Sequence, residues 1–389
     1  MKKTSILFLT ALLVLPTACC IQPKEPEVDN VIFLIGDGMG IGAVSTLVMS
    51  QEVNGFTVGE PAIGFSETSC ANKWVTDSPA GGTALANGAK TLYGRLGMGV
   101  DGEDLISSLQ VAQTLGKKTG IVVNTVLHEA TPASFYANVE SRSEGFKIAE
   151  QFVESGVDVA IGSGLEVFVN RPDSVDLTAK LIEKGYDVYL DWTSVANTQS
   201  TKYVGLLPWS NIHRRNESNV EAQADERNIV CMAAQLAAAK DDNQEELPLD
   251  PAEYLEKAVA KGIESLEKDA PNGFYLMIES AIIDGYGHNN DSPGMIEEMN
   301  EFNRTLIYLV NYVDKHPNTL LVVTADHETG NTAVTYGSKD EPFSLMFGTK
   351  GHTGNLVPLF AYGAGKKHFG RIMHNSDVSP TIEQLMKHE

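Results

Sequence analysis

Short apolar runs separated by helical patterns organise most of this chain. The runs that predict buried strands are 31–35, 119–124, 157–162, 186–190, 273–279, 319–325 and 357–363. Between several of these runs, apolar residues recur at the spacing of amphipathic helices, in 104–115, 175–184, 251–267 and 295–313. Strands that alternate with helices over such a length predict a layered α/β domain around a mainly parallel sheet.

The glycine-rich segment VIFLIGDGMGIG at 31–42 has two interpretations. A dinucleotide-binding loop needs glycine at the first, third and sixth positions; Gly36 and Gly38 supply the first two, but Ile41 occupies the last. The Gly-Lys-Ser/Thr ending of a phosphate-binding loop is also missing from this segment. The spacing therefore favours a loop that presents Asp37 to a metal ion, whose other ligands must come from distant parts of the chain.

Two further segments offer ligands at the ends of predicted structure. Asp326 and His327 follow the strand 319–325 directly, in TADHETG. A carboxylate and an imidazole at the end of a strand suit a zinc ion, although a histidine beside an aspartate is also a common surface hydrogen bond. His352 lies in the glycine-flanked loop KGHTGN, where a histidine is exposed or functional rather than packed in a core.

The segment ESAIIDGYGH adds three more candidate ligands. Glu279 ends a predicted strand, and Asp284 and His288 follow four residues apart. That spacing places two side chains on the same side of a helix. Gly285 and Gly287 make a regular helix less expected, and a loop could bring the two side chains together equally well.

A possible nucleophile lies in VTDSPAGGTALANGAKT. Ser78 precedes a helix of small residues, and Pro79 fits its first position. The serine is either an ordinary helix cap or a group that faces an anion at the helix N-terminus. The segment LHEATPASFYANVESR adds Glu129, Thr131 and Arg142, which singly fit turn or surface roles, although the planar guanidinium of Arg142 could hold two phosphoryl oxygens.

Taken in order along the chain, these motifs resemble those of the alkaline phosphatase family. The set comprises GDG, TDS before a helix of small residues, ATPA with an arginine eleven residues after its threonine, E-x4-D-x3-H, TADHETG and GHTG. The resemblance extends from residue 31 to the last predicted helix. It implies a three-layer α/β sandwich with a central, mainly parallel sheet and helices on both faces. It also implies hydrolysis of phosphate monoesters to an alcohol and inorganic phosphate through a phosphoserine intermediate.

The resemblance further implies two Zn²⁺ ions and one Mg²⁺ ion per chain, at the carboxyl edge of the sheet. The ligands of one zinc ion would be Asp284, His288 and His352. The ligands of the second would be Asp37, Asp326 and His327. Asp37 would also contact the magnesium ion, together with Glu129, Thr131 and Glu279.

Three other roles are implied by the same resemblance. Ser78 is similar to the family's nucleophile, Arg142 to its phosphate clamp, and Asp77 to the group that orients Arg142. Zinc would stabilise the serine alkoxide, so no Ser-His-Asp arrangement is needed. The alternative from another class is a non-catalytic protein that binds metal or phosphate, but the presence of both Ser78 and Arg142 favours an enzyme.

Related enzyme classes fit the sequence less well. Sulfatases need a C/S-x-P-x-R motif, whereas Ser78 is followed by Pro79 and Ala80. Phosphodiesterases of the superfamily generally use threonine as nucleophile. The sequence therefore favours a monoesterase, with diesterase activity as a side reaction.

The chain departs from the family pattern at two points. Glu129 stands where relatives usually carry Asp or His. Only 24 residues separate His327 from His352, so the crown-like domain of longer relatives should be short or absent. Because that crown supports a dimer contact, both a homodimer and a monomer stay open.

Composition and charge restrict the partners. The 389 residues are 42% hydrophobic and 21% charged, which is ordinary for a globular protein. The net charge of -22 argues against binding nucleic acid or an anionic membrane through a basic surface. The expected partners are small phosphate monoesters, and local cations must attract them.

The N-terminus predicts export. Residues 1–18 carry two lysines and then an apolar stretch at 6–15, about half of the roughly 20 residues that a spanning helix needs. The small residues before Cys19 resemble a bacterial lipoprotein cleavage site. We therefore expect a signal peptide, a tether at 19–29, and a periplasmic or lipid-anchored protein.

A single catalytic domain is expected over 30–389. The least regular part of it, 191–246, is interpreted as a cap over the active face or as a solvated loop with a helix.

Overall fold

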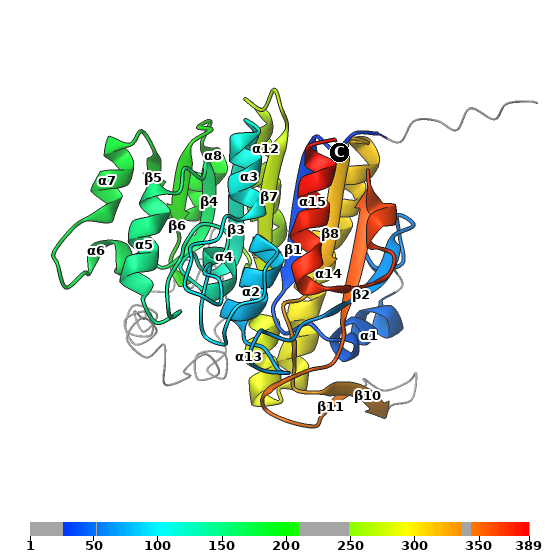
Figure 1. The fold of residues 1–389 in the computed structure, drawn as a ribbon. Coiled ribbons are helices and arrows are strands. Elements are labelled where there is room, and N and C mark those ends of the chain that lie inside the picture. Colours follow the sequence, from blue (N-terminus) through cyan, green and yellow to red (C-terminus); the bar gives the residue numbers. More distant parts are fainter. Residues whose placement is uncertain (1–25, 52, 210–248, 337–343, 389) are drawn as a thin grey trace, which may run out of the picture.

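The computed structural model describes residues 26–51, 53–209, 249–336 and 344–388. Within these residues, the largest sheet has ten strands and lies between two layers of helices (Figure 1). In order across the sheet, the strands are β14 (Ile372–His374), β2 (Ala62–Glu67), β13 (Val357–Gly363), β8 (Thr319–Thr324), β1 (Asn30–Gly36), β7 (Phe274–Ser280), β3 (Lys118–Val126), β4 (Val159–Ser163), β6 (Tyr203–Leu206) and β5 (Asp187–Tyr189).

The pairing is parallel except around one strand. β13 runs antiparallel to both β8 and β2, while the other pairs of the sheet are parallel. In the centre, Val31 of β1 pairs with Tyr275 of β7 and with Leu320 of β8. The mainly parallel sheet predicted from the sequence is therefore confirmed.

Alternating side chains of the central strand enter two separate cores. Val31, Phe33 and Ile35 join one hydrophobic cluster, whereas Ile32 and Leu34 join the other, and all five are fully buried. Since successive side chains of a strand point to opposite faces, each cluster lies on its own face of the sheet. This burial explains why the central strands appear in the sequence as continuous apolar runs.

The helices divide between the two cores, which makes the fold a three-layer α/β sandwich. Those packed in the first core are α2 (Ser78–Asn87), α3 (Ser108–Thr114), α4 (Ala130–Ala133), α5 (Gly145–Glu154), α6 (Glu166–Val169), α7 (Leu177–Glu183) and α15 (Val378–Met386). Those packed in the second are α1 (Ile41–Ser50), α8 (Trp192–Asn197), α12 (Tyr254–Glu267), α13 (Ile282–Asn289) and α14 (Ser292–Lys315).

Short elements complete the described chain. The turns of 3-10 helix are η1 (Pro251–Glu253), η2 (Lys366–Phe369) and η3 (Asn375–Asp377). Two small antiparallel pairs are β9 (Glu328–Thr329) with β12 (His352–Thr353), and β10 (Thr332–Tyr336) with β11 (Ser344–Phe347). Helix α13 and the β10–β11 pair lie at the lower edge of the sheet in Figure 1, which is its carboxyl edge.

The strands and helices predicted from apolar periodicity are confirmed, with boundaries shifted by a few residues. Among the described strands, those missed are β2, β6 and β14 of the main sheet and the small strands β9 to β12, because they are short or only partly buried and carry no long apolar run. Antiparallel or edge positions demand less hydrophobic sequence than a central parallel strand.

The region around 191–246 differs from the expected cap where it is described. α8 packs in the second core, and β6 lies inside the main sheet between β4 and β5. The first part of this region is therefore a structural unit of the sandwich, and 210–248 lie outside the described residues. The signal peptide at 1–18 and most of the tether also lie outside them, so both stay predictions.

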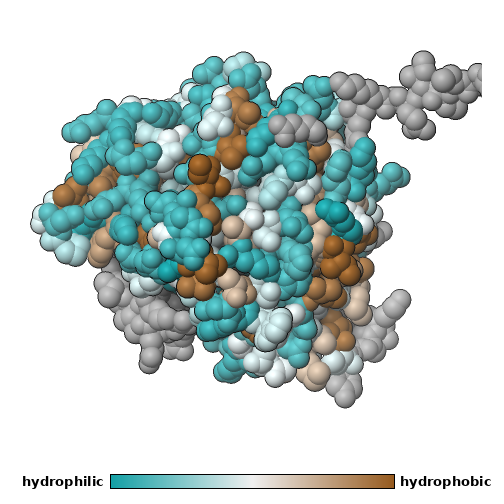
Figure 2. Space-filling model, viewed as in Figure 1, coloured by the Kyte–Doolittle hydropathy of each residue, from teal (hydrophilic) through white to brown (hydrophobic). Residues whose placement is uncertain are grey.

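Figure 2 shows the molecular surface from one side. It is mostly hydrophilic, with hydrophobic residues gathered in separate areas. Among the described residues, no helix is both long and apolar enough to cross a membrane.

A close approach of two backbones explains the glycine after Asp37. Gly38 has a φ of 71°, and a Cβ atom there would lie 2.8 Å from the Cα atom of Asp284. The loop after β1 can therefore lie directly against α13. A side chain at this position would separate the two segments.

Gly38→Ala should lower the free energy of unfolding by more than the roughly 1–2 kcal/mol that a left-handed alanine costs, because it also clashes with α13. Gly185→Ala is the matched control, since Gly185 has a φ of 84° and open space around its Cα. Urea unfolding with a chelator present would compare the two variants. Equal losses would contradict the close packing of the two segments.

Candidate active site

Three ligand-type side chains from neighbouring strands meet at the carboxyl edge of the sheet. Asp37 follows β1, and Asp326 and His327 follow the adjacent parallel strand β8. The Nε2 atom of His327 lies 3.5 Å from Asp37 Oδ1 and 3.3 Å from Asp326 Oδ2. One ligand atom of each side chain lies within 4.8 Å of the others, and all three residues are buried. This spacing fits a single cation.

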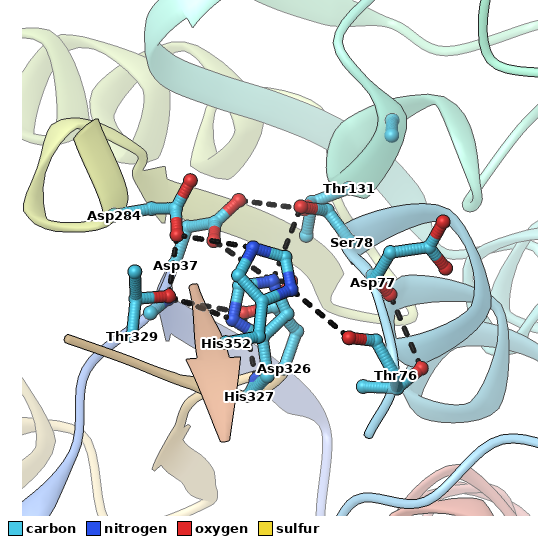
Figure 3. A network of polar contacts seen from close by, with 12 residues as sticks. Asp37, Thr76, Asp77, Ser78, Thr131, Asp284, Asp326, His327, Thr329 and His352 are labelled. Carbon is cyan, nitrogen blue, oxygen red and sulfur yellow. Dashed lines mark hydrogen bonds and ion pairs between the residues drawn. The ribbon is translucent and has the colours of Figure 1, made fainter. Parts of the chain in front are cut away.

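A second group lies beside the first (Figure 3). His288 Nε2 is 3.3 Å from Asp284 Oδ2, and His352 Nε2 is 3.5 Å from Asp284 Oδ1. The Nε2 atoms of the two histidines lie 3.1 Å apart. His327 also belongs near this group, since its ring stacks on that of His352 with centroids 3.6 Å apart. The structure thus brings together all six side chains expected to bind zinc.

Helix α13 supplies two members of the second group despite its glycines. Asp284 and His288 lie one turn apart on this regular helix, so the loop alternative is wrong. Gly287 is needed for packing, because a Cβ atom there would lie 2.8 Å from the Cγ2 atom of Thr329. The glycine therefore marks a tight contact rather than a break in the helix.

The protonation of the histidines follows from their other ring nitrogens. His288 Nδ1 lies 2.6 Å from the carbonyl oxygen of Lys350, and His352 Nδ1 lies 2.9 Å from that of Thr76. A carbonyl only accepts hydrogen bonds, so each Nδ1 must carry a proton and donate. In the neutral form, both Nε2 atoms then present lone pairs to each other at 3.1 Å. Such an arrangement requires a positive charge between them, either a proton or a metal ion.

Several buried carboxylate oxygens of the site are short of hydrogen-bond donors in the described part of the chain. Among the described residues, Asp37 Oδ1, Asp326 Oδ2 and both carboxylate oxygens of Glu279 are buried without a hydrogen-bond partner. Burial and the neighbouring Asp284 raise the pKa of Asp326 to about 7. Burial and the surrounding acids also raise the pKa of Asp37 and that of Glu279 well above their usual ranges. A bound cation would contact the carboxylate oxygens that have no hydrogen-bond partner, and its charge would favour the ionised form of these acids. The residues therefore fit metal ions.

Glu279 and Thr131 indicate where a third cation would lie. Glu279 is the penultimate residue of β7 and Thr131 lies in α4, and both are fully buried. The hydroxyl of Thr131 donates to Asp37 Oδ2 at 3.4 Å. Asp37 is therefore placed between this oxygen-rich region and the group that contains His327.

Ser78 lies directly beside the first group. Its Oγ atom is 3.2 Å from Nε2 of His327 (Figure 3). The cap of α2 is Asp77 rather than the serine, because the Asp77 carboxylate accepts the N–H of Ala80 at 3.3 Å. The small residues of α2 permit its approach, since a Cβ atom on Gly81 would lie 2.9 Å from the carbonyl oxygen of Asp326.

Arg142 pairs with Glu129 in this structure. Its Nη2 atom forms an ion pair with Glu129 Oε1. Burial acts to lower the pKa of Arg142, but the negative charges of Glu129 and Asp37 raise it above its ordinary value. Asp77 contacts Arg142 indirectly: it accepts the N–H of Gly94 at 3.2 Å, and the carbonyl of Gly94 accepts the N–H of Arg142 at 3.3 Å.

Thr329 was missed in the sequence and links the two groups. Its Oγ atom donates to Asp284 Oδ1 and lies 3.2 Å from His327 Nδ1. Because the hydroxyl proton is used by Asp284, the oxygen accepts from His327 Nδ1–H, which turns Nε2 of His327 toward Asp37. The only signal in the sequence was a threonine two residues after His327.

Glu328 was missed as well and joins the ligand-bearing loops. Its carboxylate accepts hydrogen bonds from the Thr353 hydroxyl and, at 3.1 Å, from the N–H of Thr332. The loop after β8 is thereby tied to the segment that carries His352.

This arrangement defines a class of protein. A serine within hydrogen-bond distance of a metal-type histidine, and outside any Ser-His-Asp triad, can be activated by a cation. A nearby arginine suits an anionic substrate. The fold and the site are those of a metal-dependent α/β hydrolase that acts on an anionic ester.

The chain belongs to the alkaline phosphatase family, whose sequence profile, described as "Alkaline phosphatase", matches residues 28–348. Alkaline phosphatase 4 of Bacillus subtilis is 25% identical over 450 residues, covering 94% of this chain and 90% of that protein. The chain is thus a phosphatase, and its family hydrolyses phosphate monoesters with the help of metal ions.

Solved structures agree. The alkaline phosphatase of the Antarctic bacterium TAB5 superposes with a TM-score of 0.77 at 30% identity, covering 94% of this chain and all of that one. A variant of the TAB5 enzyme, with one histidine replaced by glutamate and with magnesium bound, matches with a TM-score of 0.77 at 28% identity, covering 94% and 99% of the two chains.

Thr329→Val should weaken cation binding by about 10- to 100-fold, since the isosteric side chain gives no donor to Asp284 and no acceptor to His327. Thr332→Val is the control, because the Thr332 hydroxyl has no hydrogen-bond partner among the described residues. Competition with a graded chelator would give both affinities. Unchanged zinc affinity in Thr329→Val would contradict the linking role, and recovery in Thr329→Ser would support it.

Proposed function

We propose that this phosphatase hydrolyses phosphate monoesters through a phosphoserine on Ser78, with two Zn²⁺ ions and one Mg²⁺ ion. One observation carries the proposal. The Nδ1 atoms of His288 and His352 are held by carbonyl oxygens, so that both Nε2 atoms face Asp284. This is the arrangement of a zinc ligand set, in which the second ring nitrogen is fixed by an outer partner.

In the proposal, each zinc ion has a carboxylate and histidine set of its own. Asp284, His288 and His352 hold the first, and Asp37, Asp326 and His327 hold the second. Zinc accepts such mixed nitrogen and oxygen ligands in tetrahedral sites that leave a position for substrate or water.

The third cation is assigned to the oxygen ligands. Asp37, Thr131, Glu279 and Glu129 offer only oxygen atoms, which suits Mg²⁺ better than zinc. The family resemblance puts Glu129 where relatives usually carry Asp or His, and a TAB5 variant with glutamate in place of one histidine holds magnesium. A glutamate at this position is then compatible with magnesium, and Glu129 would exchange its contact with Arg142 for one with the ion or share both.

The phosphoryl group is transferred twice. Ser78 Oγ gives up its proton to solvent water and attacks phosphorus while the bond to the alcohol oxygen breaks. Phosphate is left esterified to Ser78, and the departing alcohol oxygen takes a proton from water. Water then attacks the same phosphorus atom and releases inorganic phosphate and the serine hydroxyl. Bound zinc would supply the positive charge that lowers the pKa of the attacking hydroxyl and water and stabilises the leaving oxygen.

The protein's own groups bind and orient the substrate in these steps. Arg142 is a cation that lies beside these acids, and its planar fork would hold two phosphoryl oxygens. Asp77 fixes the backbone of Arg142 through Gly94 and also caps α2, which carries Ser78. It therefore holds Arg142 and Ser78 in fixed positions relative to each other. His327 Nε2 is a ligand in this scheme and is not the base that receives the serine proton.

Export remains part of the proposal. The apolar stretch at 6–15 and the small residues before Cys19 support a signal peptide of the lipoprotein type. At the cell envelope, the exported enzyme would meet phosphate esters from outside the cell.

Ser78→Ala should lower kcat by several orders of magnitude and leave zinc content unchanged, because the side chain attacks phosphorus and is no structural ligand. Hydrolysis of a chromogenic phosphate monoester and metal analysis would be measured on the same preparation. Phosphate trapped at mildly acid pH on a residue other than Ser78 would overturn the assignment.

Asp37→Asn should reduce both zinc and magnesium content, since a neutral amide binds cations poorly and Asp37 belongs to two ligand sets. Asp187→Asn is the control, because Asp187 is an exposed acid of β5. Metal stoichiometry after dialysis would report the effect, and loss of one ion alone would refute the bridging role.

A further inference from the structure

A buried carboxylate lies behind the cation sites and belongs to none of them. Glu298 of α14 is 6% exposed, and its Oε1 atom accepts two hydrogen bonds. The donors are Asn124 Nδ2 at 2.6 Å and Ser280 Oγ at 2.8 Å. Both donors are fully buried, so this is a closed polar contact among β3, β7 and α14. Burying a carboxylate is costly, which raises the question of what it achieves.

One arm of this contact holds the start of α13. With its amide donor directed at Glu298, Asn124 must turn its Oδ1 the other way, where it accepts the N–H of Ala281 at 2.7 Å. Ala281 is the N-cap of α13, and its own side chain makes no capping hydrogen bond. Asn124 therefore replaces a cap and fixes where the helix of Asp284 and His288 begins.

The other arm holds the end of β7. Ser280 follows Glu279 directly, and its carbonyl oxygen accepts the N–H of Asp37 at 3.0 Å. Glu298 thus fixes the last residue of β7, which pairs with the last residue of β1. The two arms together contact the backbone beside Glu279, Asp37 and α13.

Such anchoring matters because the ligands repel one another. Asp37, Glu279 and Asp326 lie buried at one edge of the sheet, where charged carboxylates repel one another unless an ion lies between them. A cation site has high affinity only if the protein has already fixed the ligand geometry. The Oε1 atom of Glu298 is a fixed acceptor for two donors, which a hydrophobic residue could not hold.

We propose that Glu298 is a positioning residue that, through Asn124 and Ser280, fixes the ends of β7 and the start of α13 in the geometry that binds cations. The proposal rests on the metal sites of the proposed function. Glu298 touches neither substrate nor ion, so its effect is on cation affinity rather than on the chemical step.

The test uses the full chain loaded with zinc and magnesium. Glu298→Ala should weaken cation binding by about 10- to 100-fold, as loss of an outer partner of metal ligands commonly does. Glu298→Gln keeps an oxygen acceptor at the same place and should recover most of the affinity. Glu297→Ala is the matched control, since Glu297 is the exposed neighbour on the same helix. Competition with a graded chelator gives the affinities, and urea unfolding in excess chelator gives the stability of the metal-free chains.

A kinetic measurement separates positioning from catalysis. At saturating zinc and magnesium, kcat of Glu298→Ala should return close to that of the unchanged protein, while the zinc concentration for half-maximal activity rises. A lower kcat at saturation with unchanged cation affinity would overturn the proposal. So would lower stability of the metal-free chain with unchanged cation affinity, because that is the result of a merely structural role.

A double-mutant comparison tests the route through Asn124. If Glu298 acts through Asn124, combining Glu298→Ala with Asn124→Ala should cost little more affinity than Asn124→Ala alone. If the double variant instead loses cation affinity by the product of the two single fold-losses, the route through Asn124 is contradicted. Should Glu298→Ala fail to fold, Ser280→Ala removes one donor only and should still weaken cation binding relative to Glu297→Ala; equal affinities would contradict the proposal.

Failure of the proposed function has a different signature. A purified, unmutated chain that retains no zinc and hydrolyses no phosphate monoester would refute the metal site itself. An active, zinc-bound chain whose Glu298→Ala variant binds cations equally well would refute only the positioning role.

Discussion

Mutual repulsion among buried acids is the constraint on which the rest of this structure depends. The backbone brings Asp37, Glu279 and Asp326 to one edge of a parallel sheet, where burial and neighbouring charges raise the pKa of each. No domain would retain such a cluster for stability, because an apolar residue at each position would be more favourable. The cluster makes physical sense only if cations bind there. The closely approaching glycine, the small-residue helix and the fixed histidine rings then serve to build a place for those cations.

The central sheet provides this place because parallel strands end together. β1, β7 and β8 are adjacent and in register, so the residues that follow them converge without long loops. Their apolar sequences are buried by helices on both faces, which makes this edge rigid. Stability and function therefore come from the same feature. The apolar runs that form the core also determine where the acids lie.

This coupling explains what could be predicted from the sequence. The central strands were recognisable because burial on both faces requires continuous apolar runs, and candidate ligands followed from their ends. The glycines of α13 were misleading, since Gly287 serves a tight contact with Thr329 rather than a turn. The roles of Thr329 and Glu298 were not predictable. Thr329 meets Asp284 across 45 residues and Asn124 meets Glu298 across 174, and no local pattern encodes such pairs.

The ligands also differ in how they are held. Glu279 lies in β7, Asp37 directly follows β1, and Asp326 follows β8 after one intervening residue, so the register of the sheet fixes their backbones. Asp284 and His288 come from helix α13 and His352 from the two-residue strand β12, and they depend on individual hydrogen bonds with distant partners. One missing hydroxyl or amide can displace the second kind of ligand, whereas only rearrangement of the sheet can displace the first. The precision of this site is therefore concentrated in the few polar side chains that surround α13, although the fold itself is determined by the strands.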